Sequence, residues 1–510
     1  MPAAPQQPSS FSQPANVRFV MGALVATMLV AALGQTIITP ALPIIVSDLG
    51  GIEHISWAFT AYLLATTISA PVYGKLSDMF GRKLMLQTGI LIFLVGSMAA
   101  AFAWDLYSLV LFRFLQGIGG GGLIVTSMAA FADFLPPRER GKAQALVGAA
   151  FGISTVVGPL VGGIIVEMLN WRWLFLVNLP VGLIVLGIIA FAFESRRERT
   201  KRKIDFAGAG LLATTLASLV IYSSIGGTVI DWLSPQALVI LAIAFVAFAG
   251  FIFAEQRAEE PILPLSLFRI NGFVVSNTMG FIVGTVMFGT ITFLPSYLLI
   301  VKGFTPTQAG LGLLPLMLGL ITTSTLAGSF MSRTGRYKIL PILAALLLTI
   351  GAALFSTIES GTPVFLVLAY TGLIGLGIGP SMSIGVSVIQ NSVPREVIGV
   401  GTASANMFRQ IGGSFGVAVL GALFANRLTY EVATVTNGST QAFDAQSLAQ
   451  LSASALEQVR AAYTMALHPV FYVCAGLGVL AFAVGWLLRE VPLGEPHEEK
   501  GGIEATQPAK

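Results

Sequence analysis

The stretch "GKLSDMFGRK", residues 74–83, has a second copy later in the chain, "GSFMSRTGRYK", at residues 328–338. Glycine, arginine and lysine recur at similar spacing in both copies, and Ser332 stands where the first copy has Asp78. The glycines permit a tight turn, and an acid such as Asp78 interacts favourably with a helix N-terminus. Two copies of one loop predict a chain built from two related halves.

Two more pairs support this repeat. "PPRERG" at 136–141 resembles "VPREVIG" at 393–399, and "LQGIGGG" at 115–121 resembles "LIGLGIG" at 373–379. Internal symmetry of this kind in a membrane protein is typical of transporters, whose sites lie between the two halves near the bilayer midplane.

The composition is that of a membrane protein. The 510 residues are 55% hydrophobic and only 10% charged, against roughly 25% charged in soluble domains, and the mean hydropathy is +0.83. The single cysteine, Cys474, offers neither a disulfide framework nor a metal-binding cluster. We therefore expect no large soluble domain, no metal and no cofactor.

Apolar runs separated by charges, glycines and prolines predict about fourteen membrane spans of roughly 20 residues each. Their predicted limits are 17–45, 57–77, 84–103, 107–131, 142–166, 173–193, 206–225, 236–254, 272–300, 309–331, 338–357, 363–389, 399–424 and 467–488. The expected fold class is an all-α polytopic membrane protein.

Basic residues orient the spans. With the N-terminus inside, most of the 28 lysines and arginines fall on the cytoplasmic side, as the positive-inside rule requires. The other side receives only Arg172, Lys302, Arg427 and Arg460. Both termini are therefore predicted to be cytoplasmic, and the net charge of +4 needs no nucleic-acid partner to explain it.

The motifs resemble those of the major facilitator superfamily. "GKLSDMFGRK" resembles its loop signature, "LVLFRFLQGIGGG" (109–121) its fourth-span motif, and "GISTVVGPLVGG" (152–163) the fifth-span motif of its antiporters. With "WRWLFLVNLPVG" (171–182) and about fourteen spans, the chain is similar to the drug:proton antiporter branch of the EmrB/QacA type.

The resemblance implies two six-helix bundles with two additional spans between them in sequence. The N-terminal bundle would comprise 17–193, the linkers and extra spans 194–271, and the C-terminal bundle 272–488 with a long outer loop at 425–466. Residues 1–16 are predicted to be a disordered cytoplasmic tail, and 489–510 a second cytoplasmic tail.

Two arginines, Arg113 and Arg409, lie within predicted spans, where a charge is costly and indicates a functional site by default. Gln116 shares a helical face with Arg113, and Asn406 shares one with Arg409. Hydrogen bonding to helix carbonyls or neighbouring spans is the alternative role for such polar groups. The predicted substrate-cavity residues are Gln35, Thr39, Arg113, Gln116, Asn406 and Arg409.

Glycines in the loop and in the fifth span predict the conformational machinery. Small residues allow close helix approach, and proline bends a helix by removing a hydrogen bond. Tight packing without gating is the alternative. The predicted gating residues are Gly74, Asp78, Gly81, Arg82, Gly152, Gly158, Pro159, Gly162 and Gly163.

A deep acid is missing. Members of this branch carry an aspartate in a first-span motif of the type Leu-Asp-x-Thr-Ile, associated with proton coupling, but this chain reads Leu33, Gly34, Gln35, Thr36, Ile37. Neither glycine nor glutamine can exchange a proton. Asp105 and His468 are the weak remaining candidates for coupling, and two span arginines without an acid favour neutral or anionic lipophilic substrates.

The predicted function is a secondary active transporter of the bacterial inner membrane that exports lipophilic small molecules by alternating access, coupled to protons. The alternative is a facilitator or lipid translocator on the same fold, without proton coupling. A membrane-embedded enzyme is disfavoured because the chain lacks a catalytic constellation such as His-Glu-x-x-His. The outer stretch "QSLAQLSASALEQVRAAY" (446–463) could dock a periplasmic adaptor or pack against the bundle rim.

Overall fold

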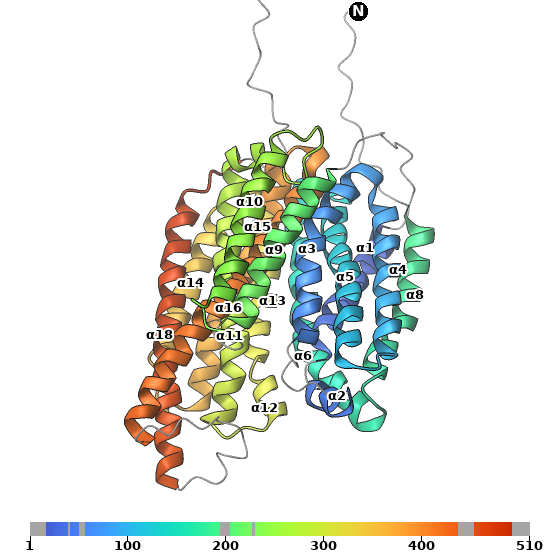
Figure 1. The fold of residues 1–510 in the computed structure, drawn as a ribbon. Helices are drawn as coiled ribbons and strands as arrows, with labels where there is room; N and C mark the ends of the chain where they lie inside the picture. Colours follow the sequence, from blue (N-terminus) through green and yellow to red (C-terminus); the bar gives the residue numbers. More distant parts are fainter. Residues whose placement is uncertain are drawn as a thin grey trace, which may run out of the picture.

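The computed structural model describes residues 17–38, 41–49, 57–193, 205–226, 230–436 and 453–491. Over these ranges the regular structure is helical, apart from an isolated bridge between Gly226 and Ile230. Long helices run side by side in two groups (Figure 1). The predictions for Thr39, for the tail 1–16 and for most of the tail 489–510 lie outside the described residues.

Six long helices form the first group, with the short helix α2 at one end (Figure 1). Their bounds are α1 Val17–Thr36, α2 Leu42–Leu49, α3 Trp57–Phe80, α4 Arg82–Ala101, α5 Leu106–Phe134, α6 Pro137–Met168, α7 Trp173–Leu176 and α8 Asn178–Ala192. We call the end that holds Gly81, between α3 and α4, the Gly81 end, and the opposite end the α2 end.

The second group also has six long helices, with the short α12 at its α2 end (Figure 1). Their bounds are α11 Asn271–Ile300, α12 Pro306–Leu311, α13 Leu314–Thr334, α14 Ile339–Phe355, α15 Val364–Ser392, α16 Ile398–Thr436 and α18 Ala453–Trp486. The 3-10 turns η3 Leu265–Arg269 and η4 Arg395–Val397 precede α11 and α16.

Helices α9 (Phe206–Ile225) and α10 (Pro235–Glu255) pair with each other as a hairpin between the two groups in sequence. In space, α9 packs against α3 of the first group and α16 of the second. Asp205 caps α9 by accepting a hydrogen bond from the Gly208 N–H, and Ser234 caps α10 in the same way. The hairpin thus lies against the junction of the two groups (Figure 1).

Each of the fourteen predicted spans coincides with a helix or helix pair, but not every one of these helices is long and apolar enough to cross a membrane. In the described part of the chain, twelve helices are long and apolar enough to cross a membrane. The other two are α3, which carries Lys75 and Asp78 at its polar end, and α14, which has only 17 residues. By length and composition the count of fourteen is therefore not supported.

The largest departures from the predicted limits lie after the first span and in the predicted outer loop. The first span was expected to reach residue 45, but α1 ends at Thr36, shortly before Pro40 in the sequence, and a separate α2 follows. The predicted loop 425–466 is largely helical, because α16 continues to Thr436 and α18 begins at Ala453. An ion pair between Arg427 and Glu431, one turn apart at 2.7 Å, stabilises the extension of α16.

The start of α18 packs against the rim of the second group. Val459 and Tyr463 are buried, and the Tyr463 ring centroid lies 4.9 Å from that of Phe424. Of the two roles predicted for this segment, the packing role fits these contacts.

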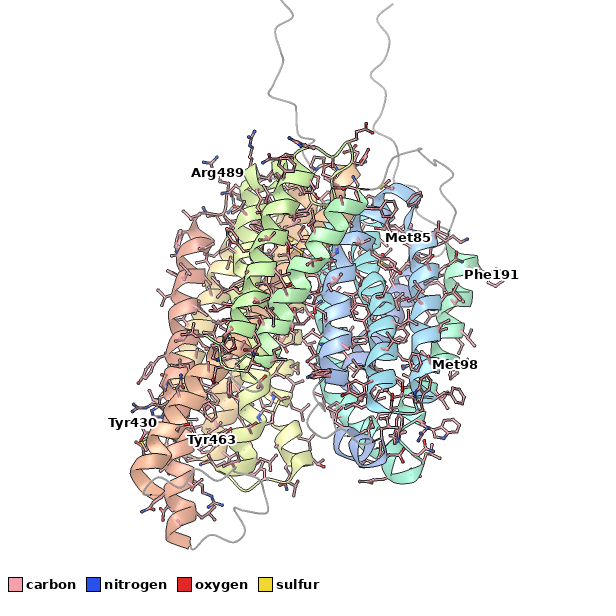
Figure 2. The ribbon with its side chains drawn as sticks, viewed as in Figure 1. Met85, Met98, Phe191, Tyr430, Tyr463 and Arg489 are labelled. Carbon is pink, nitrogen blue, oxygen red and sulfur yellow. The ribbon has the colours of Figure 1, made fainter. Side chains whose placement is uncertain are left out.

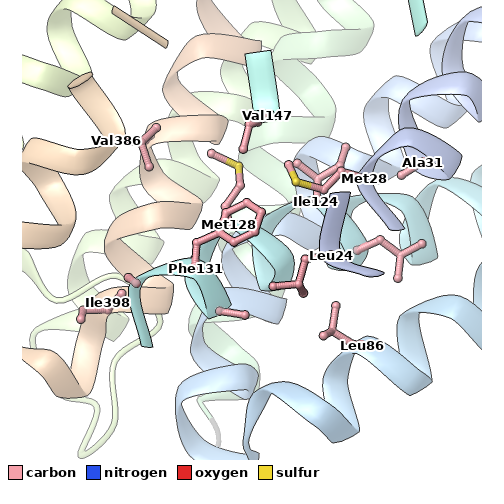
Figure 3. Close-up of a cluster of buried hydrophobic side chains, with 14 of the residues drawn as sticks. Leu24, Met28, Ala31, Leu86, Ile124, Met128, Phe131, Val147, Val386 and Ile398 are labelled. Atoms are coloured by element: carbon pink, nitrogen blue, oxygen red, sulfur yellow. The ribbon is translucent and has the colours of Figure 1, made fainter. Parts of the chain in front are cut away.

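The outer surface is apolar, as contact with lipid requires. Phe191 of α8 is 94% exposed and projects outward, as does Met98 of α4 (Figure 2). The largest buried cluster joins the two groups. Figure 3 shows Val386 and Ile398 of the second group beside Met128 and Phe131 of the first. The two groups thus share a continuous apolar core.

Candidate functional site

The first predicted loop motif joins the two helix groups, called the first and second bundles from here on, at the Gly81 end. The Asp78 carboxylate accepts hydrogen bonds from the backbone N–H groups of Gly399 (2.9 Å) and Val400 (3.0 Å), at the N-terminus of α16. Arg82 lies 2.7 Å from the same carboxylate and 2.9 Å from Asp133. A carboxylate suits a helix N-terminus, where free N–H groups and the helix dipole favour negative charge. Asp78 therefore holds α3 against α16.

Close backbone contact accompanies this clamp. A Cβ added at Gly74 would lie 2.6 Å from the Ala403 Cβ and 2.7 Å from the Gly399 carbonyl oxygen, so α3 and α16 touch only because residue 74 is glycine. Both motif copies have a glycine with positive φ at the turn, 91° at Gly81 and 70° at Gly335, although their ψ angles differ, 151° and 0°. Glycine adopts positive φ without steric cost.

The two lysines of the first motif anchor neighbouring segments. Lys83 donates to the carbonyl oxygens of Ala190 (2.7 Å) and Phe193 (2.6 Å), at the end of α8. Lys75 is buried and pairs with Glu260 at 2.7 Å, in the segment that follows α10. The motif thus ties both the first bundle and the α9–α10 hairpin to the Gly81 end.

A second contact between the bundles runs along α6 and α13. A Cβ on Gly328 would lie 2.5 Å from the Gly141 carbonyl oxygen, and a Cβ on Gly148 would lie 3.2 Å from the Ser324 hydroxyl oxygen. Gly152 lies further along α6 and also faces α13. Gly152 is among the predicted gating residues, whereas Gly141 and Gly148 are not, although the spacing of the three glycines, seven and four residues along one helix, is a readable signal.

Two further predicted glycines of α6, Gly158 and Gly163, do not contact α13. Gly158 packs against Thr36 of α1, within the first bundle. Gly162 is buried, Pro159 lies inside the helix, and a Cβ on Gly163 would meet nothing within 4 Å. The fifth-span motif is therefore divided between the contact with α13 at Gly152, packing within the first bundle at Gly158 and open space at Gly163.

Buried amides complete the closed Gly81 end. Gln390 of α15 donates to the Met128 carbonyl (3.0 Å) and accepts from Gln144 of α6 (3.3 Å). Arg140 donates to the Gln390 carbonyl (2.9 Å) and to the Asn391 side chain (2.7 Å). None of these residues is among the predicted site residues. Buried glutamines are recognisable as functional only once both bundles surround them.

Arg113 lies inside the first bundle rather than on an open surface. It is fully buried, and its guanidinium donates to the carbonyl oxygens of Gly34 (2.7 Å) and Ala58 (3.2 Å) and to Gln116 (2.7 Å). Gln116 in turn donates to Ser97 at 2.6 Å. These bonds connect α1, α3, α4 and α5. Arg113 thus has the alternative role considered for the span arginines, which is hydrogen bonding to neighbouring helices.

The position of the missing acid is filled by an aromatic ring. A Cβ on Gly34 would lie 2.9 Å from Phe93 Cζ and 3.5 Å from the Tyr62 hydroxyl. Tyr62 donates to the Ala31 carbonyl (2.7 Å), and its ring centroid lies 4.4 Å from the Arg113 guanidinium carbon. The first helix thus presents a carbonyl oxygen to Arg113, where an acidic side chain has no space.

Arg409 has a different environment. Its guanidinium makes one described hydrogen bond, to Asn406 at 2.5 Å, and its carbon lies 5.8 Å from the ring centroid of Phe151 in α6. The side chain lines a pocket of the second bundle between α11, α15 and α16. The structure therefore brings Asn406 and Arg409 together at the face toward α6.

The other predicted site residues are separate from these two arginines. Gln35 is partly buried near the end of α1. Asp105 caps α5, and hydrogen bonds from the backbone and side chain of Ser108 hold the pKa of its carboxyl below its usual value. His468 Nε2 lies 2.7 Å from the Ile358 carbonyl oxygen. Both coupling candidates thus have structural roles near the α2 end.

Comparison with known families identifies the architecture. The family model described as Major Facilitator Superfamily matches residues 24–417. The chain belongs to the Major Facilitator Superfamily. It is 39% identical over 490 residues to an uncharacterised MFS-type transporter of Mycobacterium tuberculosis, covering 95% of this chain and 71% of that protein.

Other members of the superfamily are also similar. The multidrug transporter protein MdtP of Bacillus subtilis is 37% identical over 404 residues, which cover 79% of this chain and 74% of that protein. The solved proton:xylose symporter XylE has a TM-score of 0.63 at 16% identity, with 92% of this chain and 95% of that chain covered. The fold is that of a superfamily transporter, and the chain is not an enzyme.

Proposed function

We propose that this superfamily member exports lipophilic small molecules by alternating access between its two bundles. The observation that carries the proposal is the built closure at the Gly81 end, where Asp78 binds the N-terminus of α16 across the bundle junction. Similar proteins bear the names multidrug transporter and multidrug resistance protein, which supports a lipophilic substrate class.

The bonds at this junction suit a reversible contact. Most are hydrogen bonds to backbone groups or amides, which water can replace when the bundles separate. The glycine contact between α6 and α13 lets the helices pivot without side chains interlocking. Rocking of two bundles around a midplane site is the established means of alternating access in such folds.

We propose fourteen spans with both termini cytoplasmic, as in the EmrB/QacA-type branch, in a bacterial inner membrane. The 24 residues of α3 extend about 36 Å at 1.5 Å per residue, enough for the hydrocarbon core of roughly 30 Å. The 17 residues of α14 extend about 25 Å, which local thinning of the bilayer accommodates. The basic motif loops at the Gly81 end support its cytoplasmic placement.

Proton antiport is proposed as the energy source. It rests on the resemblance to the branch alone, since Gly34 occupies the position of its acid and Asp105 and His468 have structural partners. The second candidate, a facilitator without proton coupling, is favoured by the Phe93 ring that fills the acid's space.

Reconstitution in liposomes tests both proposals. Uptake of a panel of lipophilic dyes is measured with and without an imposed pH gradient, and internal pH is recorded together with dye movement. Dye flux that depends on the gradient and moves protons supports antiport. Flux indifferent to the gradient supports the facilitator, and absence of flux for neutral, anionic and cationic dyes alike contradicts export of lipophilic compounds.

A further inference from the structure

The pocket beside Arg409 combines one charge with unused polar groups. Its other lining residues include serines, glycines and apolar side chains, and Arg409 is the charged member of the set: Ser276, Gly280, Val283, Ser381, Met382, Gly385, Val386, Ala405 and Arg409. The Ser381 hydroxyl and the Asn406 Nδ2 are buried without a hydrogen-bond partner in the described part of the chain. Buried polar groups are normally hydrogen-bonded, so these two groups have donors free for water or for a ligand.

Arg409 also has no carboxylate partner among the described residues, although it is only 6% exposed. Other basic residues, such as Lys75, Arg82 and Arg172, pair with acids. Arg113 lacks an acid too, but its Nε and Nη1 donate to three oxygens, and its Nη2 alone has no partner among the described residues. A buried guanidinium with a single neutral partner is costly, and an anion would relieve that cost.

We propose that this pocket binds the anionic head group, a carboxylate or sulfonate, of a lipophilic substrate. Arg409 supplies charge-assisted hydrogen bonds to the head group, and Ser381, which also lines the pocket, donates to a remaining oxygen. Asn406 lies outside the lining and holds the Arg409 guanidinium through its side-chain oxygen. Val283, Met382 and Val386 provide apolar wall for the adjoining part of the molecule. This inference rests on the proposed function and names its substrate class.

Arg409 lies where the two bundles meet, so binding of the substrate head group is coupled to the separation of the bundles. Phe151 of α6 faces the Arg409 guanidinium. Gln410, which follows Arg409 in the sequence, accepts a hydrogen bond from Thr67 of α3 at 3.3 Å. Both neighbours belong to the first bundle. Separation of the bundles removes these neighbours and opens Arg409 to the space between the bundles, so the anion site becomes accessible through the same motion that transports the substrate.

Glycine keeps the pocket open. A Cβ on Gly385 would meet nothing within 4 Å, and one on Gly280 would meet only the Ala405 carbonyl at 3.9 Å. A side chain at position 385 therefore begins in open space at the pocket lining. Gly187 of α8 is an equally open glycine away from the pocket, which makes Gly187→Val a matched control for Gly385→Val.

The experiment uses three probes with one dansyl fluorophore and one undecanoyl chain, which end in a carboxylate, a carboxamide or a trimethylammonium group. Binding to the purified full chain in nanodiscs is measured by dansyl fluorescence, and transport is measured in liposomes. We expect the wild-type chain to bind the carboxylate probe about tenfold or more tighter than the trimethylammonium probe.

Arg409→Gln should weaken carboxylate binding by about tenfold or more while changing carboxamide binding less than twofold. Arg409→Lys should restore part of the loss, because it keeps the charge but not the planar fork. Gly385→Val should weaken carboxylate binding, and Gly187→Val should not. Thermal unfolding of each variant shows that the protein is folded.

Preference of the wild-type chain for the trimethylammonium probe overturns the inference, as does an equal loss for all three probes in Arg409→Gln. Failure of the proposed function looks different: carboxylate binding would depend on Arg409 while no probe is transported. Transport of all three probes without head-group preference supports export and rejects the anion site.

Discussion

At the scale of single residues, two arginines with the same local sequence pattern have different environments. Each is three residues from an amide side chain on its own helix, Gln116 for Arg113 and Asn406 for Arg409. Arg113 donates to carbonyl oxygens of two neighbouring helices and is enclosed, whereas Arg409 makes one hydrogen bond among the described residues and borders a pocket. The first arginine organises a bundle, and the second is available to a ligand.

The filled space at Gly34 gives a prediction for stability. In Gly34→Ala the new Cβ would lie 2.9 Å from the Phe93 ring, and overpacking of this kind costs about 1–3 kcal/mol. Thermal unfolding of the purified protein should therefore shift to lower temperature. The matched control is Gly22→Ala on the same helix, where a Cβ meets nothing within 4 Å.

The same site tests why the acid is absent. Gly34→Asp should destabilise more than Gly34→Ala, and combining it with Phe93→Ala should recover part of the loss, because the ring no longer occupies the carboxylate's space. Additive effects of the two substitutions would show that Phe93 does not exclude the acid.

At the scale of elements, the contact between α6 and α13 depends on glycine backbones. A Cβ at position 328 would lie 2.5 Å from the Gly141 oxygen and 2.7 Å from its carbonyl carbon. Backbone atoms cannot rotate away as a side chain can. The approach of these two helices therefore limits which conformations the bundles can reach.

Gly328→Ala should prevent full closure of the Gly81 end and reduce transport in liposomes by about tenfold or more, equivalent to about 1.4 kcal/mol on the closing step. The fold of each bundle should persist, since the clash lies between bundles. Spin labels on α6 and α13 should report a wider separation. Gly476→Ala on α18, where a Cβ meets nothing within 4 Å, is the control, and wild-type transport by Gly328→Ala would contradict the role of this contact.

At the scale of the whole molecule, the α9–α10 hairpin is attached to the moving parts. Helix α9 packs against α3 and α16, and the segment after α10 supplies Glu260 to Lys75. Any rocking of the bundles must therefore move or strain the hairpin. The extra helices are thus a component of the bundle junction in this chain.

The topology makes a prediction about sidedness. With the buried Cys474 changed to serine, single cysteines are placed at the exposed positions Asp48, Glu139, Arg336 and Gly361. If α3 and α14 both cross the membrane, an impermeant maleimide should label positions 48 and 361 from outside intact cells. Positions 139 and 336 should react only after permeabilisation.

Labelling of all four cysteines from one side would contradict fourteen spans. If positions 336 and 361 alone are labelled from the same side, α14 does not cross the membrane. If positions 48 and 139 are labelled from the same side, α3 does not cross it.

The sequence by itself determined the membrane class, the limits of most helices, the internal repeat and the family, because apolar run length and glycine turns act locally. It also located Asp78 and both arginines. Tertiary structure decided which arginine borders a pocket, which α6 glycines meet α13 and what fills the acid's position. Those features depend on residues such as Phe93, Gln390 and Ser381, which are distant in sequence and acquire a role only when helices pack together.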